Sequence, residues 1–233
     1  MAIATIAECC ENVPAEIRSD KDKRVLDLYD QLICDVGEDR PLNFLEVGVF
    51  RGGSLLAFAQ RLPRAHLLGI DIEEPSAVFF AEVERLGLAD RVTFRRGSQT
   101  DAEFLHRAIS ETFGGEKLDV VTEDAMHTYA ASRATFDAVF IPWVRTGGFY
   151  AIEDWGTGYW PQWEDGHPDG RHGMVRLVKE LIDALALPDR TRIVRGARAL
   201  NAESDLSSPI SHAVIANTVA AYFRGDGGWL PPP

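Results

Sequence analysis

Residues 42–54 read LNFLEVGVFRGGS, an apolar run that leads into a turn containing three glycines. Such a run indicates a buried strand, and residues 53–61 continue with apolar side chains at helical spacing. The same alternation recurs along the chain. Because strand-helix-strand units form parallel crossovers, the pattern predicts an α/β, Rossmann-like, doubly wound sheet that is mostly parallel. The predicted strands cover 42–47, 66–71, 91–96, 118–122, 148–152 and 192–194, and the predicted helices cover 53–61, 76–86, 101–113, 130–144 and 173–185.

Composition is that of a globular protein with a core of its own. Hydrophobic residues make up 45% of the 233 residues and charged residues 26%, which suits one domain. Residues 25–33 carry apolar side chains at helical spacing. We therefore expect an N-terminal helical segment, residues 1–36, to pack on the core of a domain that covers residues 37–230.

The net charge and the absence of targeting signals limit the expected classes of partner and the expected compartment. The formal net charge of −12 opposes binding to nucleic acid and to anionic lipid, so we expect neither a nucleic-acid nor a membrane partner. No apolar run reaches the roughly 18–20 residues that span a bilayer, and the first residues lack the basic leader of a signal peptide. The three cysteines, Cys9, Cys10 and Cys34, are too few and too irregular for a disulfide framework, so the cytoplasm is the expected compartment.

The predicted sheet directs attention to the residues that follow its strands. Ligands of open α/β sheets bind outside the carboxyl ends of the strands. Acidic residues close four of the five central strands in this chain, at positions 46, 71, 123–124 and 153–154. Several carboxylates converging on one crevice suit a polyol, a cation, or both.

The first turn and the next strand end favour an adenosyl ligand. The turn departs from the G-x-G-x-x-G pattern of dinucleotide sites because position 50 is Phe, so a pyrophosphate cradle is disfavoured. Asp71 stands where an acidic residue accepts hydrogen bonds from ribose hydroxyls. Arg51, beside the turn, could meet a cofactor carboxylate. The alternative is a left-handed glycine turn, a helix-capping Asp71 and a surface Arg51.

The ends of strands 118–122 and 148–152 carry the residues for chemistry. Asp124 and the pair Glu153 and Asp154 would lie side by side on adjacent strands, where three carboxylates repel one another unless a cation neutralises them. Oxygen ligands select a hard ion such as Mg²⁺. His127 follows Asp124 by three residues and is suited to abstract a proton near neutral pH. The alternative is a structural histidine and acids that only cap helices.

A long connection rich in tryptophan and glycine follows Asp154. It contains Trp155, Tyr159 and Trp160, and its length and aromatic content favour a functional loop over disorder. We expect these three side chains to form the wall of an acceptor site, where flat rings pack on the apolar faces of a sugar. A buried aromatic cluster or a subunit contact is the alternative, and a homo-oligomer is compatible with the sequence.

These motifs resemble the class I S-adenosylmethionine-dependent methyltransferases, in which E-x-G-x-x-x-G forms the first turn and an acidic residue such as Asp71 follows. The strand ends further resemble the metal-dependent sugar O-methyltransferases that act on macrolide deoxysugars, a group grading into cephalosporin hydroxylase-like proteins. Their D-D-G-S-H and E-D-x-x-T-x-Y-W patterns correspond to EDAMH at 123–127 and EDWGTGYW at 153–160. The replacement of G-S by Ala125 and Met126 leaves the local backbone and the substrate contacts open.

The resemblance implies a seven-stranded sheet whose last strand runs antiparallel, formed in part by residues 213–222. It also implies S-adenosylmethionine and Mg²⁺ as cofactors, with metal ligands at Asp124, Glu153 and Asp154 and with His127 as general base assisted by Asp124. The implied cofactor-binding residues are Glu46, Gly48, Arg51, Gly52, Ser54, Asp71, Ser98, Gln99 and Glu123.

The expected function is Mg²⁺-dependent methylation of a hydroxyl on a small-molecule saccharide or glycoside. Two alternatives remain open. The acceptor could be a catechol-like or other polyhydroxylated small molecule, since vicinal hydroxyls chelate the same ion. The departure at Ala125 and Met126 also allows an adenosyl-binding protein without turnover. An iron-dependent hydroxylase is disfavoured, because three carboxylates do not form the two-histidine, one-carboxylate set that suits iron.

Overall fold

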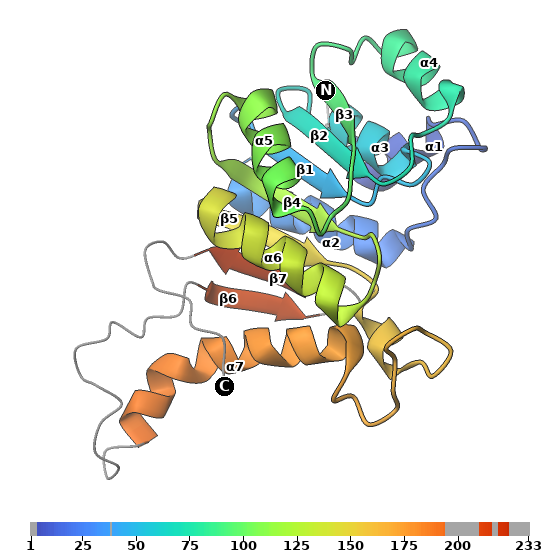
Figure 1. Cartoon of the computed structure of the whole chain (residues 1–233). Helices are drawn as coiled ribbons and strands as arrows, with labels where there is room; N and C mark the ends of the chain where they lie inside the picture. The colour runs from blue at the N-terminus through green and yellow to red at the C-terminus, as the bar shows by residue number, and fades with distance from the viewer. Residues whose placement is uncertain (1–3, 38, 194–209, 216–218, 224–233) are drawn as a thin grey trace.

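A parallel sheet with helices on both faces forms the body of the molecule (Figure 1). The computed structural model describes residues 4–37, 39–193, 210–215 and 219–223. The strand order is β3-β2-β1-β4-β5-β7-β6; the first five strands pair in parallel, and β7 pairs antiparallel with both β5 and β6. The predicted α/β Rossmann-like fold with a parallel sheet is confirmed. The strands are β1 (Asn43–Val47), β2 (His66–Asp71), β3 (Val92–Arg96), β4 (Leu118–Glu123), β5 (Val144–Ile152), β6 (Ile210–Ile215) and β7 (Val219–Phe223).

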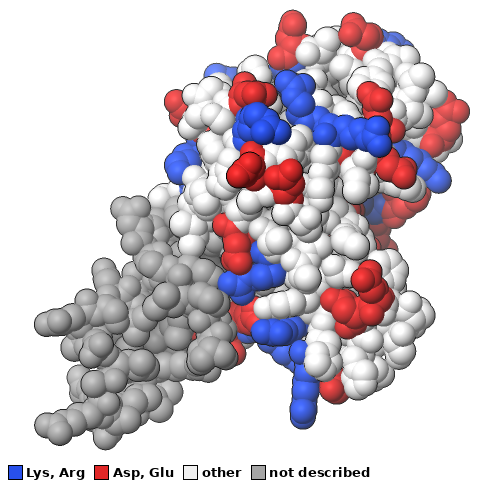
Figure 2. All heavy atoms as spheres, in the orientation of Figure 1, with Lys and Arg blue, Asp and Glu red and all other residues white. Residues whose placement is uncertain are grey.

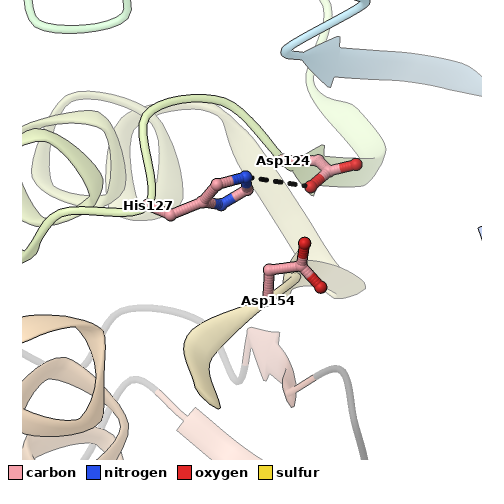
Figure 3. Close-up of side chains that lie close together, drawn as sticks. All are labelled: Asp124, His127 and Asp154. Carbon is pink, nitrogen blue, oxygen red and sulfur yellow. Dashed lines mark ion pairs between the residues drawn. The ribbon is translucent and has the colours of Figure 1, made fainter. Parts of the chain in front are cut away.

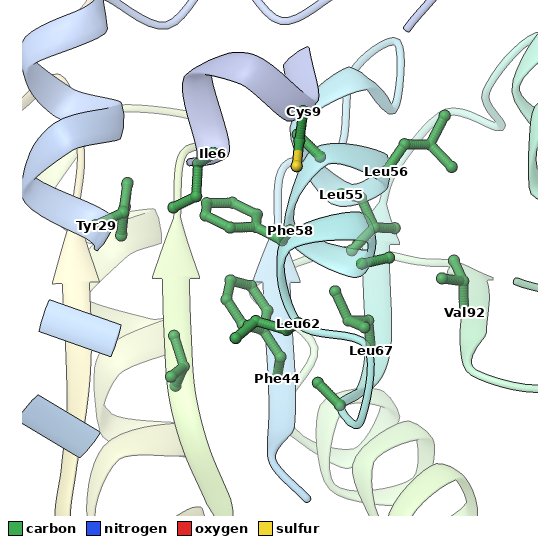
Figure 4. Close-up of a cluster of buried hydrophobic side chains, with 14 of the residues drawn as sticks. Ile6, Cys9, Tyr29, Phe44, Leu55, Leu56, Phe58, Leu62, Leu67 and Val92 are labelled. Carbon is green, nitrogen blue, oxygen red and sulfur yellow. The ribbon is translucent and has the colours of Figure 1, made fainter. Parts of the chain in front are cut away.

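Two hydrophobic cores sandwich the central strands, because successive residues of a strand face opposite sides of the sheet. Phe44 points into one core and Leu45 into the other, and Phe149 and Tyr150 divide in the same way. The first core, shown in Figure 4, lies beneath α1–α4, and the second lies beneath α5–α7. The helices are α1 (Ile6–Glu11), α2 (Lys23–Val36), α3 (Gly53–Arg61), α4 (Ala77–Arg85), α5 (Ala102–Phe113), α6 (Tyr129–Trp143) and α7 (Gly173–Ile193).

The N-terminal segment packs closely on the core. The fully buried Tyr29 of α2 packs edge-on against Phe58 of α3, with ring centroids 5.3 Å apart. Gly53 begins α3 directly beneath residues 17–19; a Cβ at this position would lie 2.2 Å from the Ile17 carbonyl oxygen. The glycine is therefore needed for this segment to approach the first turn of the sheet.

The helix after the aromatic connection is longer than the sequence pattern predicts. Residues 192–194 were predicted as a strand, but α7 continues to Ile193, so Arg192 and Ile193 are helical; Val194 lies outside the described residues. The β-branched residues at 193 and 194 favoured a strand, and the helix shows that local propensity did not decide this segment. The expected final run, 213–222, falls on β6 and β7 and on the undescribed residues 216–218 between them.

The helices and one face of the surface bear on the expected partners. No described helix is long and apolar enough to cross a bilayer. On the face shown in Figure 2, Asp and Glu side chains lie among the Lys and Arg side chains.

Candidate active site

The register of the sheet brings the predicted acidic residues together. Glu123 at the end of β4 pairs with Ile152 of β5 on one side and with Val47 of β1 on the other. The following residue, Asp124, therefore lies between the β1 turn and the acidic pair that ends β5. Gly48 permits this approach, because a Cβ there would lie 2.2 Å from the backbone oxygen of Asp124.

Three side chains converge beyond the strand ends (Figure 3). Asp124, His127 and Asp154 each offer a ligand atom, and these atoms all lie within 4.8 Å of one another. The Nε2 atom of His127 is 3.6 Å from Oδ1 of Asp124. Asp154 is exposed and points toward both from the end of β5, so the group opens to solvent on one side. Two carboxylates with an open face suit a hard divalent cation.

Glu153 lies near this group but faces inward. It is 4% exposed, and its Oε1 accepts hydrogen bonds from Lys21 Nζ at 2.8 Å and from Tyr29 Oη at 2.7 Å. Lys21 Nζ also lies 2.5 Å from Oδ2 of Asp124. An ammonium group from the N-terminal segment therefore bridges two of the three carboxylates that were expected to bind a metal, and Glu153 is not part of the converging group.

The buried charges around Lys21 are strongly perturbed. Burial lowers the pKa of Lys21, but the nearby Glu153 and Asp124 carboxylates outweigh this effect and raise its pKa above the usual value. Burial raises the pKa of Glu46 to about 8, although Lys21 and a hydrogen bond from Ser54 oppose the rise. Burial likewise raises the pKa of Glu123 to about 7. The three strand-end carboxylates, Asp124, Glu153 and Asp154, together with the Lys21 ammonium carry a formal charge of −2 when all are ionised, which a divalent cation would balance.

The loop that carries His127 is held from outside its own strand. His127 has a φ of 52°, in the left-handed region that side chains other than glycine rarely adopt. The backbone N–H of Met126 donates to the buried Gln99 Oε1 at 2.9 Å, and Trp163 Nε1 donates to the His127 carbonyl at 3.0 Å. The N–H of Tyr129 donates to a carboxylate oxygen of Asp165 at 2.7 Å. Gln99 and the aromatic connection thus hold three backbone groups of this loop, at residues 126, 127 and 129.

Two cavities meet at the converging group. The larger, of about 740 Å³, extends from Asp71 to His127, and the smaller, of about 320 Å³, lies between residues 17–25 and the first turn. Gly48, Phe50, Asp124 and Asp154 line both cavities. Phe50, His127 and Asp154 are the three non-glycine residues with positive φ in the described ranges, so strained backbone concentrates at these cavities.

Some of the predicted cofactor-binding residues line these cavities. Gly48, Asp71, Ser98 and Gln99 line the larger cavity, and Arg51 and Ser54 line the smaller one. The two carboxylate oxygens of Asp71 accept hydrogen bonds from the backbone N–H groups of Phe50 and Glu73, at 2.8 and 3.0 Å. A carboxylate retains further lone pairs for ribose hydroxyls.

Other predicted cofactor-binding residues support the cavities from within. Glu46 is fully buried and accepts a hydrogen bond from Ser54, while Glu123 is fully buried and accepts one from the Gln99 amide. Neither lines one of the two cavities. Gly52 caps the N-terminus of α3 with a φ of 93° and packs against Phe79, since a Cβ there would lie 2.1 Å from that ring. Their assignment as cofactor ligands stays a prediction.

The predicted aromatic wall begins at the site but does not line the cavities. Trp155 and Tyr159 lie in the short 3₁₀ helix Trp155–Tyr159, with ring centroids 6.5 Å apart. Tyr159 and Trp160 are exposed, and neither they nor Trp155 line either cavity. They follow Asp154 directly in the chain, and their role in acceptor binding stays a prediction.

Sequence reasoning missed four residues that shape this site: Lys21, Tyr29, Trp163 and Asp165. The sequence contains Lys21 in the segment Ser19-Asp20-Lys21, which matches the sugar O-methyltransferase pattern only faintly. Trp163 belongs to the same aromatic connection as the predicted wall. No local pattern distinguishes an indole that binds a substrate from one that donates to a backbone carbonyl.

Known proteins share both the sequence and the fold. A methyltransferase-domain profile matches residues 45–155. The mycinamicin VI 2''-O-methyltransferase of Micromonospora griseorubida is 36% identical over 167 residues, covering 67% of this chain and 38% of that protein. The L-olivosyl-oleandolide 3-O-methyltransferase of Streptomyces antibioticus is 32% identical over 175 residues, covering 70% of this chain and 41% of that protein.

A solved structure agrees with these relatives. The MycE methyltransferase from the mycinamycin pathway, in complex with Mg, SAH and mycinamycin VI, superposes with a TM-score of 0.62 and 26% identity. The match covers 98% of this chain and 51% of that one. The chain thus spans about half the length of MycE, and the matches to the two sequence relatives cover 38% and 41% of their lengths. Residues 45–155 thus match a methyltransferase domain, and the chain resembles the sugar O-methyltransferases of macrolides and related glycosides.

Proposed function

We propose that the chain transfers a methyl group from S-adenosylmethionine to a hydroxyl of a sugar or glycoside, with a divalent cation such as Mg²⁺ held at the strand ends. The observation that carries this proposal is the convergence of Asp124, His127 and Asp154 where the two cavities meet. The similarity to sugar O-methyltransferases supports the acceptor class.

The residues at the strand ends fit a hard cation. Asp124 and Asp154 would hold it through carboxylate oxygens, and Glu153, tied to Asp124 through Lys21, would contribute charge beside them. A bound divalent cation supplies Lewis acidity and a template for the acceptor hydroxyl. One such ion would balance the formal charge of −2 carried by Asp124, Glu153, Asp154 and Lys21.

His127 would act as the general base. Its Nε2 faces Asp124, and its Nδ1 is buried without a hydrogen-bond partner. An imidazole beside the cation-binding carboxylates can take the proton of an acceptor hydroxyl as that oxygen attacks the methyl group.

The larger cavity fits the nucleoside part of the cofactor. Its volume of about 740 Å³ lies in the range of small-molecule sites, about 300–1,000 Å³. Asp71 would accept the ribose hydroxyls, and Ser98 would flank the adenine. Arg51 and Ser54, in the smaller cavity, would face the amino-acid end. S-adenosylmethionine supplies the electrophilic methyl group.

The proposal extends to the acceptor contacts and the compartment. Trp155, Tyr159 and Trp160 would contact the saccharide beside Asp154. The free thiols of Cys9, Cys10 and Cys34 agree with a reducing cytoplasm. The same proposal includes the seven-stranded fold of the family, the domain bounds 37–230 and a homo-oligomer.

The test is incubation with methyl-labelled S-adenosylmethionine and a panel of macrolide glycosides, simple glycosides and catechols. We expect label in a glycoside, loss of transfer in excess EDTA and recovery with Mg²⁺. Transfer that persists in EDTA contradicts the metal assignment, and transfer to catechols alone contradicts the acceptor class. The variant His127→Ala separates a general base from a metal ligand. We expect its turnover in the labelled-methyl assay to fall about 10³-fold. Its affinity for Mn²⁺, measured by calorimetry, should be unchanged.

A further inference from the structure

One side chain of the aromatic connection has a polar contact that substrate binding does not explain. The indole N–H of Trp163 donates to the backbone carbonyl of His127 at 3.0 Å, and the two rings lie 5.8 Å apart at an interplanar angle of 53°. We propose that Trp163 is a positioning residue for His127, which sets the direction of the imidazole rather than contacting the acceptor. This inference rests on the proposed role of His127 as base.

The backbone at His127 needs such support. A non-glycine residue at a φ of 52° persists only where its surroundings determine the conformation. The His127 side chain is 13% exposed, and its Nδ1 has no hydrogen-bond partner, so its own ring polar atoms do little to orient it. The direction of the His127 carbonyl depends on the backbone conformation at this residue. The hydrogen bond from Trp163 to that carbonyl therefore stabilises the strained conformation.

The neighbouring contacts complete the support. Gln99 holds the residue before His127 through the N–H of Met126, and Asp165 holds Tyr129 two residues after it. Gln99 comes from the loop after β3, whereas Trp163 and Asp165 come from the connection that follows β5. The loop is thus fixed on one side by the sheet and on the other by the tryptophan-rich segment. Of these three contacts, only the Trp163 bond reaches His127 itself.

The expected consequence concerns the rate rather than binding. A reacting group displaced by a fraction of an ångström loses catalytic rate steeply while the binding sites keep their contacts. Losing the Trp163 hydrogen bond should therefore lower kcat about tenfold. The affinities for S-adenosylhomocysteine and Mn²⁺, and KM for the acceptor, should stay within about twofold, since Trp163 lines neither cavity.

The experiment compares Trp163→Phe with Trp143→Phe. Trp143 is a matched control because it is also half-buried and its indole N–H donates a 2.8 Å hydrogen bond, to His106 Nδ1, remote from the cavities. We expect kcat to fall in Trp163→Phe and to keep the wild-type value in Trp143→Phe. Equal kcat in Trp163→Phe and wild type, or a parallel loss of cofactor affinity, would overturn the proposal.

A second replacement protects the test against misfolding. Introducing 3-benzothienylalanine at position 163 keeps the bicyclic ring and removes only the N–H donor. The ring signal of His127, identified in ¹³C-labelled protein by its absence from His127→Ala, should shift or split in this variant. An unchanged His127 signal contradicts the positioning role even if no acceptor is found. Absence of turnover in wild-type protein on the whole panel would instead contradict the proposed function.

Discussion

Two aspartates at opposite ends of β4 differ in how completely their charges are satisfied. Asp119, at the start, is 5% exposed and accepts hydrogen bonds from the Arg40 and Arg145 side chains and from the N–H of Asn43. Asp124, just past the end, is 24% exposed; Lys21 is its one ion-pair partner within hydrogen-bond distance in the described part of the chain. The Asp119 carboxylate is fully paired within the fold. The Asp124 carboxylate keeps an oxygen directed at His127 and Asp154.

The difference shows which end of the sheet has acidic groups that remain available to a ligand. At the carboxyl ends of the strands, Asp124 and Glu153 share a single ammonium, that of Lys21. At the amino ends, arginines reach Asp119 from two other segments. An acid with a complete partner set contributes to stability, whereas one left with an open oxygen can bind a cation or a substrate.

The contrast between Asp124 and Asp119 is tested most directly by replacing each with asparagine, which removes the charge. We expect Asp124→Asn to lower methyl transfer at least 10³-fold, because the cation-binding group loses a charged ligand. Asp119→Asn is the matched control and should leave kcat nearly unchanged. Turnover of labelled S-adenosylmethionine with a glycoside measures both. Comparable losses in the two variants would show that the contrast between the two ends has no functional meaning.

The reverse effect should appear in stability. We expect Asp119→Asn to lower the free energy of unfolding by about 2–3 kcal/mol, because a buried carboxylate loses its ion pairs. The half-exposed Arg40 keeps the effect below that of a fully buried network. Asp124→Asn should cost less, since Lys21 retains Glu153. Urea unfolding measures both, and a larger loss for Asp124→Asn would contradict this expectation.

A third acid extends the comparison to pH. Burial raises the pKa of Glu46 to about 8 from 4.5, so the folded state binds its proton more tightly than the unfolded state. The stabilisation is full below about pH 4.5 and is lost as the pH rises toward about 8. Glu46→Gln should therefore match wild type at pH 4.5 and be more stable at pH 8, by about 4 kcal/mol. Parallel curves of unfolding free energy against pH would count against a raised pKa.

The smallest effect is expected at Asp71, whose backbone contacts leave lone pairs for a ligand. We expect Asp71→Asn to weaken binding of S-adenosylhomocysteine about tenfold, through loss of charge-assisted hydrogen bonds to ribose. Calorimetry measures this, with Glu73→Gln as a control on the same loop. Unchanged affinity in Asp71→Asn would mean that the larger cavity does not hold the nucleoside.

Much of the fold could be predicted from local patterns. The bounds of β2 and α3 match the predicted ranges, because each segment has a single hydrophobic period and a clear end signal. The strand proposed at 192–194 was wrong, and the start of β5 was placed four residues late, at 148 rather than Val144. Near these points the pattern is weaker, and tertiary pairing decides where a strand begins.

The candidate site was predictable only in part, for a geometric reason. The sequence alone determined which carboxylates would gather, since parallel strands end at one edge and Asp124, Glu153 and Asp154 each follow such a strand. Only the tertiary structure decided which of them remain open. Lys21 lies 103 residues before Asp124 and 132 before Glu153, and Trp163 lies 36 residues after His127. Contacts over such separations depend on how loops and helices pack around the sheet, which no periodicity within a single segment records.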